Sequence, residues 1–202
     1  MGGKDAIVVD AECDLDGVVS GVVAAGFGYQ GQKCSACRRA IVHEAVYGEF
    51  LRRLEPRVAA LTVGDTTDPR FSMGPVISAG ARKTILRYVD VGRAEGRLVA
   101  GGGESPGPGY FLPPPVLAVT KALDFDFALE LANDSDYGLT GAVYCLVPEH
   151  LERAKAEIHV GNLYLNRKCA SAMVGAHPFG GFNLSGTDSK AGGPDYLLQL
   201  CK

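Results

Sequence analysis

The sequence predicts an α/β fold in which a mostly parallel sheet is flanked by helices. Short apolar, β-branched runs alternate with stretches of helical periodicity along the whole chain, the pattern typical of βα units. Of the 202 residues, 47% are hydrophobic and 21% are charged, a balance that supports one domain with a sizeable buried core. We therefore expect residues 1–202 to form a single domain without internal repeats.

The expected elements of the first half follow from periodicity and from helix-boundary residues. Asp14 precedes the first helical stretch, and Gly96 ends the third. The helix expected over 44–61 carries one apolar stripe: Val46, Phe50, Leu54, Val58 and Leu61. The expected strands are 6–9, 39–42 and 98–100, and the expected helices are 15–25, 44–61 and 79–96.

The second half continues the alternation and ends in an irregular region. Strands are expected at 115–121, 140–146 and 162–166, and helices at 124–133 and 149–158. Proline and glycine clusters predict loops over 63–75 and 101–109, and residues 168–193 are glycine-rich. Residues 196–200 are expected to form a last strand.

Charge and composition exclude several classes of protein. The net charge is −3 with both signs interspersed, so no nucleic-acid partner is indicated. The apolar runs are too short to cross a membrane, and no hydrophobic signal segment follows Met1. A chain of this size needs no disulfides, so we interpret the six cysteines as free thiols in a reducing, cytoplasmic compartment.

The segment Gly26-Phe27-Gly28-Tyr29-Gln30-Gly31 has the G-x-G-x-x-G spacing of a dinucleotide-binding turn. That fingerprint needs a strand before it and a helix after it. Here a helical pattern precedes it and Cys34 follows. We therefore expect the glycines to bend the backbone tightly into a reactive-site loop.

Cys34 and Cys37 form a C-x-x-C pair with several interpretations. A zinc site needs a second ligand pair, which the scattered histidines do not supply; a dithiol redox pair and two ordinary buried thiols remain alternatives. Lys33, Arg38 and Arg39 place positive charge beside Cys34 in the sequence, which favours the nucleophilic thiolate. If Ser35 opens a helical turn, the helix N terminus adds to this effect.

Five short motifs lie in order along the chain. They are Met1-Gly2-Gly3-Lys4, Gly31-Gln32-Lys33-Cys34, Asn133–Leu139, Gly161–Asn166 and Pro178-Phe179-Gly180-Gly181. In this order they resemble the motifs of aldehyde dehydrogenases, and together they cover essentially the whole chain. From the residues alone, the last motif is either a turn packed on the core or a wall of a small-molecule pocket.

The resemblance implies an NAD-dependent oxidation of an aldehyde to a carboxylic acid, with Cys34 as the catalytic nucleophile. The segments 166–168 and 185–197 resemble those of family members that oxidise glutamate γ-semialdehyde in proline catabolism. For such a substrate the resemblance implies contacts from Ser35, from Ser171-Ala172 and from Phe179 as a pocket wall. Ser171 stands where these relatives typically have glycine.

The chain departs from the family in two places. The glutamate that precedes the G-G-K motif, which acts as the general base, is absent, as is the N-terminal NAD-binding domain. A segment also appears to be deleted near 113–115. We therefore expect the chain alone to be inactive, with most of the NAD site missing, no metal and no cofactor-binding residue of its own.

Two other functions stay open at this level. One is a non-catalytic fragment that acts as an assembly or interaction module, and the other is a dithiol redox protein that uses Cys34 and Cys37. The resemblance also implies a homo-oligomer, a dimer or larger, that assembles through edge strands, for which residues 196–202 are a candidate.

Overall fold

The computed structural model describes residues 2–103, 109–116, 119–173, 176–193, 196–197 and 201. It divides into two compact units, one made of residues 1–50 and 120–202 and the other of residues 51–119. The first unit holds the sheet and every residue that the sequence nominates for a site. The two units are described separately below.

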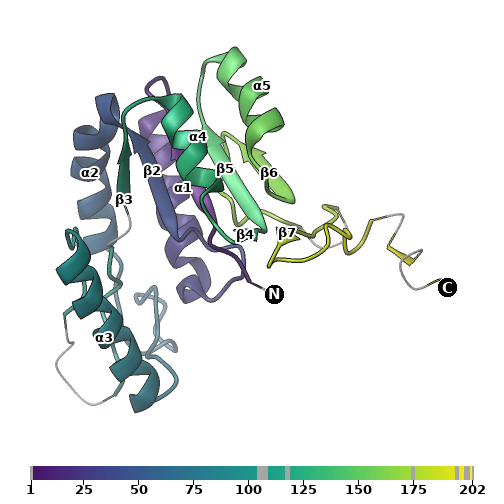
Figure 1. The fold of residues 1–202 in the computed structure, drawn as a ribbon. Helices are drawn as coiled ribbons and strands as arrows, with labels where there is room; N and C mark the ends of the chain where they lie inside the picture. The colour runs from purple at the N-terminus through teal and green to yellow at the C-terminus, as the bar shows by residue number, and fades with distance from the viewer. Residues whose placement is uncertain are drawn as a thin grey trace. The chain divides into compact units, whose positions relative to one another are not determined.

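The first unit is built on a five-stranded sheet in the order β3-β2-β1-β5-β6 (Figure 1). Strand β1 pairs in parallel with β2 and with β5, and β5 pairs in parallel with β6. The predicted α/β class with a mostly parallel sheet is therefore confirmed. The strands are β1 (Ala6–Val9), β2 (Arg39–His43), β3 (Val119–Ala122), β5 (Thr140–Tyr144) and β6 (Asn162–Leu165).

The core lies on both faces of the central strand β1, whose four residues are all buried. Ala6 and Val8 pack with the apolar side of α4 (Phe125–Asn133) and α5 (Pro148–Glu157). Figure 1 shows α1 (Leu15–Phe27) on the opposite side of the sheet from α4. A strand that buries both faces needs a continuous apolar run, and Ala6–Val9 supplies it.

Helix starts follow the side chains that the sequence offers as caps. The Asp14 carboxylate accepts a bond from the Gly17 amide at the start of α1, and Asp124 does the same for Phe127 at the start of α4. These bonds satisfy amides that have no partner inside the helix. The apolar stripe of α2 (Glu44–Ala59) is buried at Phe50, where the exposed fraction is 0%.

The second unit contains α3 (Ala79–Glu95), which begins at the Ser78 cap and ends at Gly96. The strand expected over 98–100 is wrong. Ala100 forms only an isolated bridge with Val116, and the left-handed glycines Gly101 and Gly102 follow directly. The strand expected over 115–121 is partly confirmed as β3, while residues 117–118 lie outside the described part.

The irregular C-terminal region holds one pairing that the sequence did not predict. Strands β4 (Tyr137–Gly138) and β7 (Phe182–Asn183) form a short antiparallel pair. Runs of two residues carry too little periodicity to be recognised. Tyr196 and Leu197, the described part of the expected last strand, form a turn instead. Among the described residues, no helix is long and apolar enough to span a membrane.

Candidate active site around Cys34

Cys34 lies in a tight turn between α1 and β2, and its side chain is exposed. The Ala36 amide donates to the Lys33 carbonyl over 3.1 Å and closes the turn. Ser35 is buried, and the chain then runs extended into β2. No helix begins at Ser35, so the expected support of the thiolate by a helix N terminus is wrong.

The glycine-rich segment before this turn is a reversal of the chain. Tyr29, Gln30 and Gly31 have φ values of 56°, 57° and 67°, three successive left-handed residues. Left-handed backbone disfavours residues with a Cβ, and such strain concentrates at functional sites. The segment lies at the end of α1 and is followed by the Cys34 turn, whereas a dinucleotide fingerprint follows a strand and opens a helix.

The two arginines beside the turn bind backbone carbonyls. Arg38 donates to the Gly31 carbonyl over 3.0 Å. Arg39 donates to the carbonyls of Leu131 and Ala132 at the C-terminal end of α4, over 2.8 and 3.1 Å. A cation at this end compensates the helix dipole. Arg39 therefore stabilises α4, a role that differs from the one expected at the Cys34 thiol.

The other cysteines of this unit differ from Cys34. The Cys37 thiol faces inward, where it contacts the Arg39 carbonyl and hydrogen-bonds to Cys169. That hydrogen bond and burial raise the pKa of Cys169 far above its ordinary value. Burial and a bond to Asp10 raise the pKa of Cys145 to about 12. Cys145 and Cys169 are buried thiols at neutral pH, so neither is suited to attack a carbonyl.

The family-like motifs, which are distant in the sequence, are joined by hydrogen bonds. The Ser185 hydroxyl donates to the Gly2 carbonyl over 2.6 Å and accepts from the Gly138 amide over 3.1 Å. The Lys4 ammonium lies 4.8 Å from the centre of the Tyr137 ring. The sequence analysis includes Ser185 only as the start of the family-like segment 185–197 and gives it no role of its own, because a serine in a loop does not reveal its distant partners.

Gly3 lies directly beside the Cys34 turn. A Cβ built at Gly3 would come within 2.6 Å of the Cys34 carbonyl oxygen and within 2.3 Å of the Asp5 carboxylate. Such contacts are too close for any side chain. The glycine of the G-G-K motif therefore allows this segment to approach the backbone of the reactive turn.

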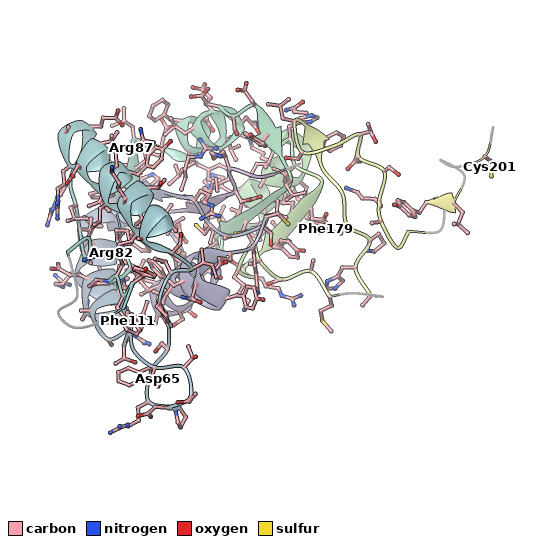
Figure 2. The ribbon with its side chains drawn as sticks, turned by 90° about the horizontal axis from the view of Figure 1, so that it is seen from below. Asp65, Arg82, Arg87, Phe111, Phe179 and Cys201 are labelled. Atoms are coloured by element: carbon pink, nitrogen blue, oxygen red, sulfur yellow. The ribbon has the colours of Figure 1, made fainter. Side chains whose placement is uncertain are left out.

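The Pro178–Gly181 loop is anchored to the start of β6. The Asn162 amide group donates to the Pro178 carbonyl over 2.9 Å, and its carbonyl accepts from the Gly180 amide over 3.3 Å. The Lys190 ammonium bonds the carbonyls of Gly161 and Gly180. These bonds make the loop a fixed surface. Phe179, labelled in Figure 2, is half-buried and its backbone pairs with Ala191.

The nominated substrate-binding residues fall into two groups. Ser35 is brought to the 169–172 loop, because the Cys169 thiol donates to the Ser35 carbonyl over 3.4 Å. Ser171 is buried with its hydroxyl unpaired, and Ala172 is exposed. Ser171 and Ala172 line an open pocket together with Arg167 and Lys168. Phe179, Ser35 and Cys34 are not among the residues of this pocket.

Comparison with known proteins agrees with this arrangement of motifs. Residues 1–117 and 114–202 match the aldehyde dehydrogenase family, and the chain belongs to that family. It is 51% identical over 217 residues to the 1-pyrroline-5-carboxylate dehydrogenase of Geobacillus sp. (strain WCH70) and 48% identical to that of Bacillus subtilis (strain 168). Each alignment covers 98% of this chain and 42% of the relative, so the chain spans about two fifths of their length.

A solved structure of a relative has the same fold as this chain. The 1-pyrroline-5-carboxylate dehydrogenase from Thermus with bound NAD superposes with a TM-score of 0.92 at 46% identity. The superposition covers 98% of this chain and 42% of that one. The fold, including the mostly parallel sheet, is therefore that of the aldehyde dehydrogenases.

Proposed function

We propose that this chain is the nucleophile-bearing part of an NAD-dependent aldehyde dehydrogenase that oxidises glutamate γ-semialdehyde, the open form of 1-pyrroline-5-carboxylate, to glutamate. The observation that carries the proposal is the exposed Cys34 thiol, on a turn that follows the strained segment 29–31 and that the G-G-K segment approaches. The identity of about half to 1-pyrroline-5-carboxylate dehydrogenases supports the substrate.

The chemistry assigned to Cys34 is covalent catalysis. The thiolate adds to the aldehyde carbon, and the carbonyl oxygen becomes an oxyanion that the Cys34 backbone amide stabilises. Loss of hydride leaves a thioester on Cys34, and water releases the acid and restores the thiol. A turn that projects the thiol into solvent suits this role, because the aldehyde must reach the sulfur.

The pocket beside the 169–172 loop supports a substrate that carries a carboxylate. Arg167 and Lys168 contribute positive charge there, and Ser171 contributes a hydroxyl that has no protein partner. Unpaired buried hydroxyls are costly unless a ligand or water satisfies them. We assign Ser35, Ser171 and Ala172 to binding of the amino-acid end, and Phe179 to the wall.

NAD enters the proposal as the hydride acceptor of the complete enzyme. The glycine-rich segment 26–31 does not fit a dinucleotide, since it follows α1 and reverses the chain. No step is therefore assigned to residues of this chain acting on the cofactor. The 202 residues alone are expected to bind aldehyde without sustained NADH formation.

An internal deletion near 113–115 belongs to the same proposal. The two family matches meet at 114–117, and the alignments run over 217 residues, more than the 202 of the chain. Both observations support the loss of a segment at this point. The complete enzyme is proposed to be an oligomer.

Two chimeras test the function. Each joins the N-terminal part of the Bacillus subtilis relative to this chain, and one of them also restores the relative's segment near 113–115. We expect NADH formation from glutamate γ-semialdehyde in the restored chimera, and loss of it after Cys34→Ser. A folded, restored chimera with no activity would contradict the proposal and favour an assembly module.

A matched variant tests the substrate pocket. Ser171→Ala in the active chimera is expected to raise KM for glutamate γ-semialdehyde with little change for propanal, which has no carboxylate or amino group. Thr66→Ser, on the other compact unit, serves as the control. Equal effects of Ser171→Ala on both aldehydes would contradict the assignment of Ser171.

A further inference from the structure

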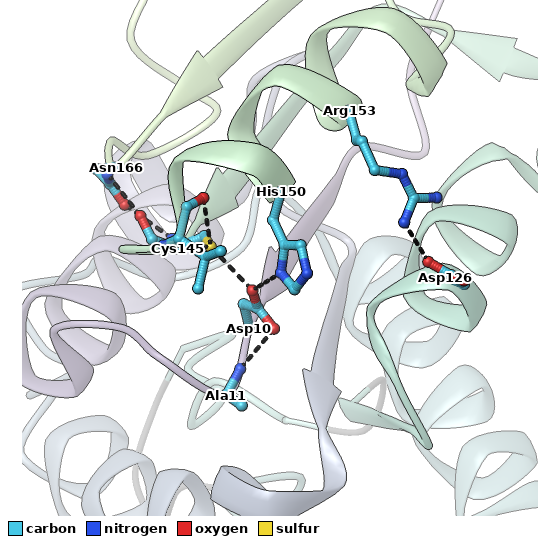
Figure 3. A network of polar contacts seen from close by, with 8 residues as sticks. Asp10, Ala11, Asp126, Cys145, His150, Arg153 and Asn166 are labelled. Carbon is cyan, nitrogen blue, oxygen red and sulfur yellow. Dashed lines mark hydrogen bonds and ion pairs between the residues drawn. The ribbon is translucent and has the colours of Figure 1, made fainter.

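A second cluster of reactive side chains lies apart from Cys34 in the same compact unit. The Cys145 thiol donates to the Asp10 carboxylate over 2.9 Å, and His150 Nδ1 lies 2.6 Å from the same oxygen (Figure 3). One ligand atom from each of the three residues lies within 4.8 Å of the others. The aldehyde chemistry assigned above uses none of them.

The cluster is located where open α/β sheets bind ligands. Asp10 directly follows β1, and Cys145 directly follows β5, two neighbouring parallel strands. Both residues therefore lie at the carboxyl edge of the sheet, the edge at which such folds place their ligands. His150 reaches the cluster from the first turn of α5.

An open pocket with a mixed polar and apolar lining reaches the cluster at Asp10 and His150, and Cys145 is not among its lining residues. Its residues include Asp10, Glu12, His43, Asp124, Asp126 and His150. Asp126 is paired with Arg153, and the Asp124 side chain caps α4. The carboxylates of Asp10 and Glu12 leave the pocket attractive to a cation. The His150 side chain is 33% exposed, whereas Asp10 is 2% exposed.

The ligand set and its geometry select a transition metal over calcium or magnesium. Thiolate and imidazole are ligands for zinc and cobalt, whereas calcium and magnesium take oxygen ligands. A tetrahedral zinc ion with bonds of about 2.0–2.3 Å separates its ligands by roughly 3.3–3.8 Å. The Asp10–Cys145 and Asp10–His150 contacts are slightly shorter, so a small outward movement would admit the ion.

The surroundings hold the ligands in place. The His150 ring stacks on Phe125 with the centroids 4.2 Å apart and the planes 5° from parallel. The Cys145 backbone is fixed on both sides by Asn166, whose side chain accepts from its amide over 2.9 Å and donates to its carbonyl over 3.0 Å. Such support orients metal ligands and strengthens their binding.

We propose that Asp10, Cys145 and His150 form a binding site for one zinc-like divalent cation at the carboxyl edge of the sheet. Binding moves two protons: the Cys145 thiol proton passes to solvent as a thiolate–metal bond forms, and the proton on His150 Nδ1 moves to Nε2, so that Nδ1 can bind the metal. Water completes the coordination. The site is separate from Cys34 and does not depend on the aldehyde chemistry.

Cobalt titration of the metal-free 202-residue chain tests the site. We expect one equivalent of Co²⁺ to produce thiolate-to-cobalt absorption in the near ultraviolet, together with visible bands of tetrahedral cobalt. One proton is released for each ion bound. Zn²⁺ is expected to displace the cobalt, and a large excess of Ca²⁺ is expected to leave the spectrum unchanged.

Variants separate this site from the other thiols. Cys145→Ser should remove the thiolate band, and His150→Gln should weaken binding at least tenfold. The double variant Cys34→Ser, Cys201→Ser, which removes the two exposed thiols, should bind like the parent. His43→Gln is a matched control, because His43 lines the same pocket but lies outside the ligand set.

Three outcomes would overturn the proposal. The first is a thiolate band that survives Cys145→Ser, and the second is one that disappears with Cys34 and Cys201. The third is displacement of cobalt by Ca²⁺ at equal concentration, which would show that the acidic side chains attract any divalent cation. Circular dichroism of each variant confirms that the fold is kept, and serine retains the hydrogen-bond donor that Cys145 supplies to Asp10.

Discussion

Replacement of Arg39 by methionine tests the role that the structure gives to this side chain. The guanidinium donates to the carbonyls of Leu131 over 2.8 Å, Ala132 over 3.1 Å and Asp134 over 3.1 Å, with a longer bond to Lys4 at 3.4 Å. It thus joins the C-terminal end of α4 to the segments beside β1 and β2. Methionine keeps much of the aliphatic stem and removes every one of these bonds.

The expected loss of stability follows from these contacts. A net contribution of about 1.5–3 kcal/mol is usual for a hydrogen bond that involves a charged group, but water can reach several of the carbonyls released here. We therefore expect a total loss of about 3 kcal/mol. For a chain of this size that corresponds to a fall in Tm of roughly 6–12 °C.

Urea unfolding followed by circular dichroism measures the change in free energy. Arg70→Met is the matched control, since Arg70 forms only an exposed pair with Asp68 and its side chain is 83% exposed. Its unfolding midpoint should stay near that of the parent. If Arg39→Met behaves like Arg70→Met, the assignment of Arg39 to the end of α4 is refuted.

Three further predictions concern burial and reactivity. Burial raises the pKa of Asp5, and this effect exceeds that of the hydrogen bonds that lower it. The contribution of Asp5 to the free energy of unfolding is therefore largest below the pKa of Asp5 in the unfolded chain. It falls as the pH rises through the pKa of Asp5 in the folded chain. Unfolding midpoints of Asp5→Asn should therefore decline less between about pH 4 and pH 7 than those of the parent, and parallel curves would contradict this. Gly161→Ala should lower the free energy of unfolding by about 1–3 kcal/mol or more, because the new Cβ would lie 1.7 Å from the Gly180 carbonyl oxygen. Gly48→Ala is the control, because the space around Gly48 is open. Equal unfolding midpoints for the two variants would refute the clash. Iodoacetamide should label Cys34 in the folded chain and Cys145 only after unfolding, and mass spectrometry of peptides would reveal the opposite order.

Periodicity was sufficient to predict most of the fold. Apolar runs such as Ala6–Val9 are strands because both faces are buried, and capping residues such as Asp14 define helix starts. The prediction failed where pairing is short or depends on distant partners. The segment 98–100 has residues typical of strands but forms only one isolated bridge, between Ala100 and Val116. Strands β4 and β7 have two residues each, too few to show a periodic pattern in the sequence.

The sequence nominates the residues of the candidate site but not their surroundings. The order of the motifs points to Cys34 as the proposed nucleophile, yet adjacency in the sequence does not tell where a side chain points. Arg39 begins β2 and reaches α4, which no local pattern indicates. The left-handed Tyr29 and Gln30 have no sequence signature either. In the Asp10 cluster, Cys145 and His150 lie 135 and 140 positions away from Asp10 in the sequence.

The central position of β1 has a consequence for the order in which the chain folds during synthesis. One edge of β1 can pair with β2 as soon as residue 43 has emerged, but its other edge must wait for β5 at 140–144. Long-range parallel pairing of this kind closes slowly. An apolar strand edge therefore stays open while residues 44–139 are synthesised, at a stage when chains are prone to aggregate. The hydrogen bonds from the Thr140 amide to Asp5 and from the Cys145 thiol to Asp10 close the two ends of that seam.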